Sequence, residues 1–126
     1  MQYAILCYND ESTIATWTKA EDDACLARLD TVCQAMAAKG RLGPVARLQP
    51  TATATTLRKS ATGAMLMDGP FAETKEQFLG FFVAECETLD DAVAFAKDLA
   101  IANPGIGAYE IRPLSLFTPN TITAAA

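Results

Sequence analysis

Two segments of the chain are apolar without the polar alternation of an ordinary surface strand. Residues 3–8 are apolar or aromatic at every position, and residues 78–84 are apolar throughout, with Gly80 as the only break. A strand with one solvent-facing side would alternate apolar with polar residues. The pattern therefore predicts strands at 2–8 and 78–84 that are covered on both faces, with a bulge or a close backbone approach at Gly80.

Two other segments repeat apolar residues every three or four positions, as amphipathic helices do. Each follows a threonine, Thr18 or Thr88, with an acidic residue three positions later, which is the capping-box pattern. The first helix is predicted at 19–39, ending at Gly40, and the second ends before Pro104. The apolar stripes expected to be buried are Cys25, Leu29, Val32, Cys33 and Met36 in the first helix, and Ala92, Phe95, Ala96 and Leu99 in the second.

Short strands are indicated where brief apolar runs are bounded by turn residues. They are predicted at 44–48, 55–59, 64–67 and 108–112. The element order favours an α+β fold, in which an antiparallel sheet carries both helices on one face. Residues 1–126 are expected to form one domain, with a frayed tail at 120–126.

Two helices cover only one face of such a sheet, although its strands are apolar on both. An uncovered face would exceed the few hundred Å² of apolar surface that a monomer normally exposes. Twofold pairing with an identical chain would cover it. The sequence therefore predicts a homodimer that packs sheet on sheet.

The composition narrows the classes of function. The chain has 126 residues, 51% of them hydrophobic and 20% charged, with a net charge of −5. This acidic balance disfavours binding to nucleic acid or to anionic membranes. The absence of a long apolar run and of a signal-peptide pattern predicts a cytoplasmic protein with no membrane segment.

The cysteines and the missing histidine limit the chemistry further. The four cysteines form no C-x-x-C pair, and the chain has no histidine. No metal or other cofactor is expected from this set, and the cysteines are interpreted as small buried side chains. Acid–base chemistry near neutral pH would then need perturbed carboxylates, Lys, Tyr or Cys.

One ten-residue block carries the clearest resemblance. Residues 68–77 are DGPFAETKEQ, followed directly by FLGFFVAECETLDDAVAFAKDL and, near the end, by YEIRPL. This combination resembles the YCII-related family, and in particular its DGPF-domain branch. The resemblance extends from Tyr3 to Leu114.

The resemblance implies a ferredoxin-like fold that dimerises into an α+β barrel. It also implies a setting in regulation, because members of the DGPF branch often accompany extracytoplasmic-function sigma factors. More distant relatives of the fold include isomerases, dehalogenase-like proteins and cofactor-free monooxygenases. A His–Asp pair suspected in some YCII-type proteins cannot be transferred, since this chain lacks histidine.

The block also supplies the candidate site residues. Asp68 is a candidate general base, and Phe71, Glu73 and Lys75 are candidate ligand contacts at the mouth of an inter-sheet cavity. The alternative is that Asp68 and Glu73 are turn and capping residues, Phe71 is a packing residue and Lys75 is solvated, since turn chemistry explains every residue type present. Arg112 either pairs with a carboxylate on its own strand or holds a ligand carboxylate.

Three functions remain open from the sequence. The first is a homodimeric small-molecule-binding protein, accessory to sigma-factor regulation. The second is a cofactor-free isomerase, lyase or dehalogenase-type enzyme that uses Asp68 as general base. The third is a structural or protein-interaction dimer. Trp17, the single tryptophan, is a candidate cover for a cavity, with ordinary packing as the alternative.

Overall fold

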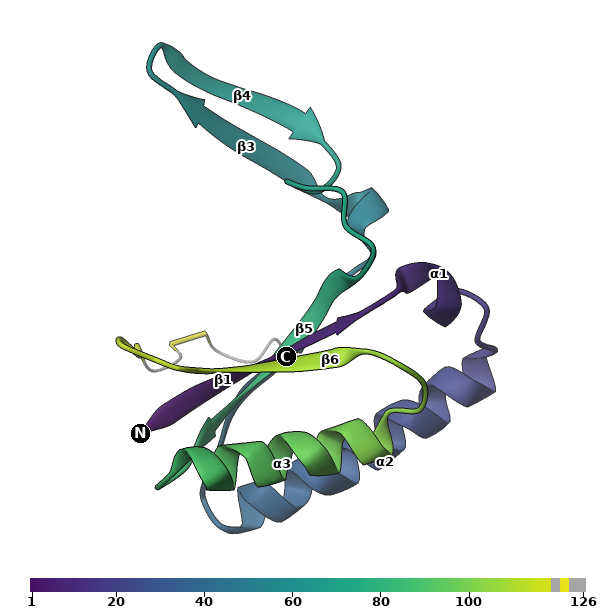
Figure 1. Ribbon diagram of the computed structural model, residues 1–126, viewed down its shortest axis with the longest axis vertical. Coiled ribbons are helices and arrows are strands. Elements are labelled where there is room, and N and C mark those ends of the chain that lie inside the picture. Colours follow the sequence, from purple (N-terminus) through teal and green to yellow (C-terminus); the bar gives the residue numbers. More distant parts are fainter. Residues whose placement is uncertain (119–120, 123–126) are drawn as a thin grey trace.

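A four-stranded antiparallel sheet carries two long helices on one of its faces (Figure 1). The computed structural model describes residues 1–118 and 121–122. The strand order is β2-β5-β1-β6, which places the N-terminal strand inside the sheet and agrees with a ferredoxin-like arrangement. The elements are β1 (Gln2–Asn9), α1 (Glu11–Ile14), α2 (Lys19–Ala38), β2 (Leu42–Arg47), the 3₁₀ turn η1 (Thr51–Thr53), β3 (Thr55–Ser60), β4 (Gly63–Asp68), β5 (Gln77–Glu85), α3 (Leu89–Ala102) and β6 (Ala108–Pro113).

The core lies between the sheet and the two helices. On β1 the side chains of Tyr3, Ile5 and Cys7 are buried on the helix side, and Ile5 is aligned with Phe82 on β5. Phe82 in turn meets Phe95 of α3 edge-on, with ring centroids 6.3 Å apart. Both apolar stripes predicted for the helices are confirmed as packing faces of this core.

The helices begin where the sequence predicts. The Thr18 hydroxyl accepts a bond from the Glu21 N–H at 3.1 Å, and the Glu21 carboxylate accepts one from the Thr18 N–H at 3.2 Å, completing the capping box. The Thr88 hydroxyl accepts from the Asp91 N–H at 3.2 Å. Gly40 has a φ of +69°, which explains why a glycine ends α2.

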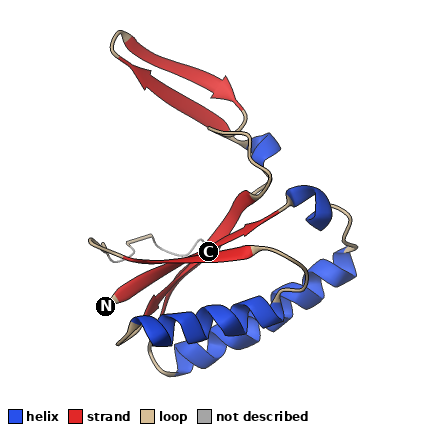
Figure 2. Ribbon diagram, viewed as in Figure 1, coloured by secondary structure: helices blue, strands red, loops and turns tan. Residues whose placement is uncertain are grey.

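The strand group in the middle of the chain is divided. β2 joins the sheet beside β5, but β3 and β4 pair only with each other and form a separate hairpin that projects from the body (Figure 2). The connection between β1 and α2 also contains the short helix α1. Apolar runs predicted these strands correctly, but their lengths do not say which neighbour each one pairs with.

The sheet face opposite the helices is apolar as well. We call this the open face and define it by Leu6, Tyr8, Phe78 and Phe81, which alternate with the helix-facing residues of β1 and β5. The Tyr8 and Phe78 rings are in contact in a tilted arrangement, with ring centroids 5.5 Å apart. The prediction of strands apolar on both sides is confirmed.

The chain ends and the helices complete the description. The predicted frayed tail at 120–126 lies outside the described residues except for positions 121 and 122. Among the described residues, no helix is both long enough and apolar enough to cross a membrane.

Candidate functional site

A cavity of about 320 Å³ lies between α2 and the sheet, on the helix side of β2 and β5. Its walls are mainly apolar, and Trp17 forms part of them. Ligand-binding cavities usually have about this size or more, with apolar walls and a few polar groups. The apolar lining comprises Cys7, Ile14, Trp17, Cys25, Leu26, Leu29, Cys33, Leu42, Val45, Leu79 and Phe82.

The floor of the cavity depends on Gly80. A side chain at this position would overlap the Ala46 carbonyl oxygen and lie within 3.2 Å of the Arg47 Cα atom. The β1–β5 register also shifts beside Gly80, between Cys7 and Tyr8. Both expectations for Gly80, a bulge and a close backbone approach, are confirmed.

One end of the cavity holds neutral polar groups. The Asn103 amide donates a hydrogen bond to the Tyr109 hydroxyl oxygen at 3.0 Å, and the Cys25 thiol donates to the Asn103 carbonyl oxygen at 3.4 Å. Burial raises the pKa of the Tyr109 phenol and of the Cys7 and Cys25 thiols. These groups are therefore uncharged at neutral pH, and neither thiol is an activated nucleophile.

An ion pair also lies in the cavity wall, close to Cys25. The Arg47 guanidinium binds both carboxylate oxygens of Asp22, at 2.9 and 3.0 Å, joining the end of β2 to the first turn of α2. The bond to Asp22 is the main cause that raises the pKa of Arg47. Both side chains line the cavity, and Asp30 lines it as well, so the Arg47 charge is already compensated and an anionic ligand group would find no free cation among the lining residues.

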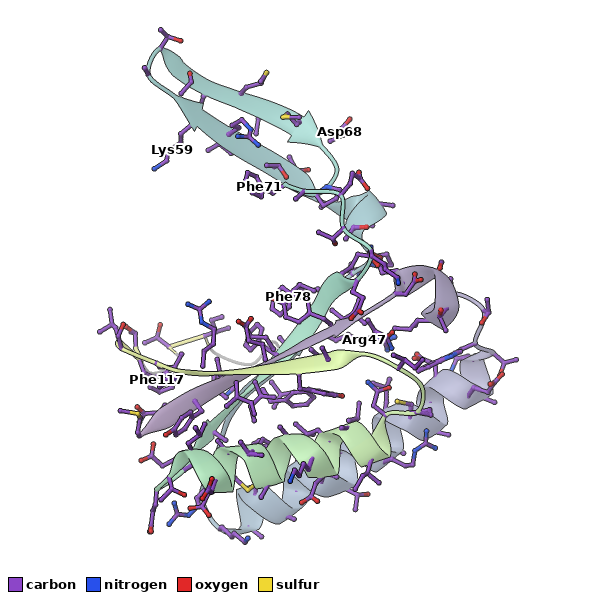
Figure 3. The ribbon with its side chains drawn as sticks, in the orientation of Figure 1. Arg47, Lys59, Asp68, Phe71, Phe78 and Phe117 are labelled. Carbon is purple, nitrogen blue, oxygen red and sulfur yellow. The ribbon has the colours of Figure 1, made fainter. Side chains whose placement is uncertain are left out.

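The candidate residues of the DGPF block lie elsewhere. Asp68 ends β4 on the projecting hairpin, and Phe71, Glu73 and Lys75 follow it in the exposed loop that returns to the sheet (Figure 3). Phe71 is 70% exposed and lies against the Arg58 guanidinium, 4.8 Å from its ring centroid. None of these residues lines the cavity, because they belong to the projecting hairpin and to the loop that follows it.

Arg112 is placed on the open face. It lies on β6 opposite Ala4, and Glu110 lies two positions earlier on the same face. The two side chains form no ion pair in the part of the chain described, and the Glu110 carboxylate instead accepts from the Tyr8 hydroxyl at 3.4 Å. Arg112 is exposed and does not reach the cavity.

Sequence reasoning missed most of the site. Trp17 could be identified from the sequence, because a single tryptophan in the loop before a helix is a candidate to cover a cavity. Tyr109, Asn103 and Arg47 carried none, since each is an ordinary residue at the end of an element. Within the described residues, no three histidine, cysteine or acidic side chains are grouped to hold a metal ion.

The fold and the cavity define a small ferredoxin-like α+β protein with a mainly apolar cavity between its sheet and α2. Comparison with known proteins gives the family. The YCII-related domain matches residues 1–118. The chain is also 53% identical, over 97% of its length and 98% of the relative, to an uncharacterized protein of Rhizobium meliloti (strain 1021). The chain therefore belongs to the YCII-related family.

Proposed function

We propose that the protein is a homodimeric small-molecule-binding protein whose ligand occupies the cavity between α2 and the sheet. The observation that carries this proposal is the cavity itself: about 320 Å³, with apolar walls and a neutral polar end. Its volume suits a compact ligand of one or two rings. Binding without reaction is supported by the hydrogen bonds that satisfy Asn103 and by burial, which raises the pKa of the Cys7 and Cys25 thiols.

The walls also indicate the chemistry of the ligand. Most of its surface would be apolar, with one uncharged hydroxyl or carbonyl group directed at Tyr109 and Asn103. An anionic group would lose its hydration there without gaining a counter-ion, because Arg47 is already paired with Asp22 and the other charged side chain of the lining, Asp30, is a carboxylate. The polar end thus favours neutral over anionic ligands.

The single tryptophan allows a direct binding experiment. Because Trp17 lines the cavity, a neutral brominated probe such as 4-bromobenzyl alcohol should quench its fluorescence in a saturable way. Leu26→Phe narrows the cavity and should weaken binding at least tenfold. Ile101→Phe makes the same kind of change on α3, outside the cavity, and should bind like the wild type. Linear, unsaturable quenching that is equal in all three proteins would exclude the cavity as a binding site.

The homodimer is proposed from the open face. Leu6, Phe78 and Phe81 leave an apolar layer opposite the helices, where a second copy related by twofold symmetry would supply the cover. Two sheets packed in this way would make the α+β barrel that the family resemblance implies. In that arrangement the binding cavities stay one to a chain, on the outer sides of the barrel.

An accessory role in sigma-factor regulation is proposed from the resemblance to the DGPF branch. Ligand occupancy would then change transcription from promoters read by such a factor in the native host. A promoter reporter should respond to deletion of the gene and recover with the wild-type chain but not with Leu26→Phe. Equal recovery by both would separate the regulatory role from the cavity.

The catalytic alternative has less support. Asp68 is exposed on the hairpin and is not part of the cavity wall, so it does not have the low-dielectric surroundings that a carboxylate base needs near neutral pH. Turnover that is lost on Asp68→Asn would favour the enzyme. The interaction-dimer alternative would be favoured if a broad screen of neutral probes found none that binds.

A further inference from the structure

The projecting hairpin lacks a core of its own. We call residues 55–68 the arm. Every residue of β4 is exposed, and an isolated two-stranded hairpin is marginally stable in water. The arm and the loop after it nevertheless expose five large apolar side chains: Leu57 (59%), Met65 (57%), Leu66 (71%), Met67 (44%) and Phe71 (70%).

Both faces of the arm are apolar. Leu57 is aligned with Leu66 on one face. Met65 and Met67 lie on the other face, with Arg58, whose guanidinium lies against Phe71. Large apolar side chains on both faces of a hairpin are unfavourable in water unless another surface covers them. Such exposure marks an interaction surface.

The base of the arm is hydrogen-bonded to the body of its own chain. The Glu11 carboxylate accepts from the Thr51 N–H at 2.9 Å, while the Gly69 N–H donates to the Ala54 carbonyl oxygen at 2.8 Å and so joins the two ends of the arm to each other. From this base the arm extends on the side of the sheet away from the helices, the side to which Phe78 of the open face also points (Figure 3). The arm therefore lies on the side where the second chain of the dimer is proposed to pack.

Charge favours another copy of the same chain as the partner. The charged residues of the arm are Arg58, Lys59 and its final Asp68, so the arm has a net charge of +1. The whole chain has a net charge of −5, so the rest of the chain has a net charge of −6. A basic apolar arm is thus complementary to the acidic, apolar body of a second copy.

We propose that the arm of each chain packs against the body of its partner in the homodimer. This inference rests on the proposed homodimer and adds a second contact to the sheet-on-sheet interface. It also places the loop with Phe71, Glu73 and Lys75 beside the partner chain. The candidate residues of the DGPF block would then act between two chains, in an interface rather than in the cavity.

Site-specific photo-crosslinking tests the contact directly. The photoreactive residue p-benzoylphenylalanine is introduced separately at Leu66 and at Met67, which point to opposite faces of the arm, and at Ile101 as an exposed apolar control on α3. Irradiation of the purified protein should give a covalent dimer from position 66, 67 or both, and none from 101. Absence of a crosslinked dimer from both arm positions would overturn the proposal.

Charge substitutions separate this inference from the homodimer itself. Leu66→Asp together with Met67→Asp should raise the dimer dissociation constant at least tenfold, whereas Ile101→Asp should leave it unchanged. A dimer whose dissociation constant is unaffected by the arm substitutions, and which gives no crosslink, would refute the arm contact and leave the homodimer intact. A wild-type chain that remains monomeric at high micromolar concentration would refute both. Unchanged far-ultraviolet circular dichroism confirms that the body of each variant is folded.

Discussion

Gly80 is a residue at which β2 passes close to β5. Its lack of a side chain lets the Ala46 carbonyl oxygen and the Arg47 backbone approach, and all three residues line the floor of the cavity. The sequence indicated a special role for Gly80 because a glycine interrupts an otherwise apolar strand. It gave no sign of a cavity there, because a cavity depends on the distance between two elements.

We expect Gly80→Ala to lower the free energy of unfolding by about 1–3 kcal/mol, because the added methyl group would force the two backbones apart. Gly40→Ala is a suitable comparison. Its Cβ would meet open space, so only the strain of a φ of +69° remains, at about 1 kcal/mol. Urea unfolding of both variants measures the difference. Equal losses would show that the β2–β5 approach is not tight.

The buried thiols predict how stability depends on alkaline pH. Burial raises the pKa of all four cysteines above the ordinary value of 9.0, so the unfolded chain releases these protons at lower pH than the folded chain. The stabilisation is complete below about pH 9 and is lost as the pH rises through the folded-state values. The melting temperature should therefore fall from pH 8 to pH 10.5.

Cys33→Ala supplies the control for this pH dependence. The variant should be less stable at pH 8, because a buried side chain is shortened, but its melting temperature should decline less steeply with pH. An identical slope in the variant and the wild type would show that the Cys33 thiol makes no contribution. The measurement requires a reductant, since all four cysteines are free.

At the scale of elements, the sequence predicted helices better than strand partners. Thr18, Thr88 and Gly40 mark helix ends through local chemistry that acts within three or four residues. Strand pairing depends on residues far apart in the chain. The sequence of residues 55–68 does not indicate that β3 and β4 pair only with each other. The DGPF block showed the same limit, because its turn residues were recognised while their distance from the cavity was not.

Thr18→Val should lower the free energy of unfolding by about 1 kcal/mol, because the hydroxyl that receives the Glu21 N–H is removed while the shape of the side chain is kept. Thr31→Val is the matched control on α2. Thr31 is exposed in mid-helix and bonds only the Ala27 carbonyl oxygen, so its loss should stay within about 0.5 kcal/mol. A similar loss for both variants, measured by urea unfolding, would argue against a special role for the cap.

At the scale of the whole molecule, the two sides of the sheet differ in what covers them. One side is packed by α2 and α3, and the other leaves Leu6 and Phe81 aligned with each other at the centre of the open face. Sequence pattern alone identified this imbalance, because it needed only the count of helices and the polarity of the strands. The position of the arm could not be predicted in the same way.

Phe81→Lys should convert the proposed dimer into a monomer, because two lysines would be buried without partners across the twofold interface. Size-exclusion chromatography with light scattering should then give the mass of one chain instead of two. Ile101→Lys introduces the same charge on the solvent side of α3 and should leave the mass unchanged. A wild-type mass of one chain would remove the basis for the barrel.

The two outer strands of the sheet have a further consequence for how copies can meet. Both β2 and β6 contain a proline, Pro44 and Pro113, and each also carries an arginine. A proline has no N–H to donate to an incoming strand. A charged side chain on an edge strand also opposes pairing with the same edge strand of another chain. Both features therefore oppose edge-to-edge pairing of sheets from different chains, and so oppose the formation of fibres at high protein concentration.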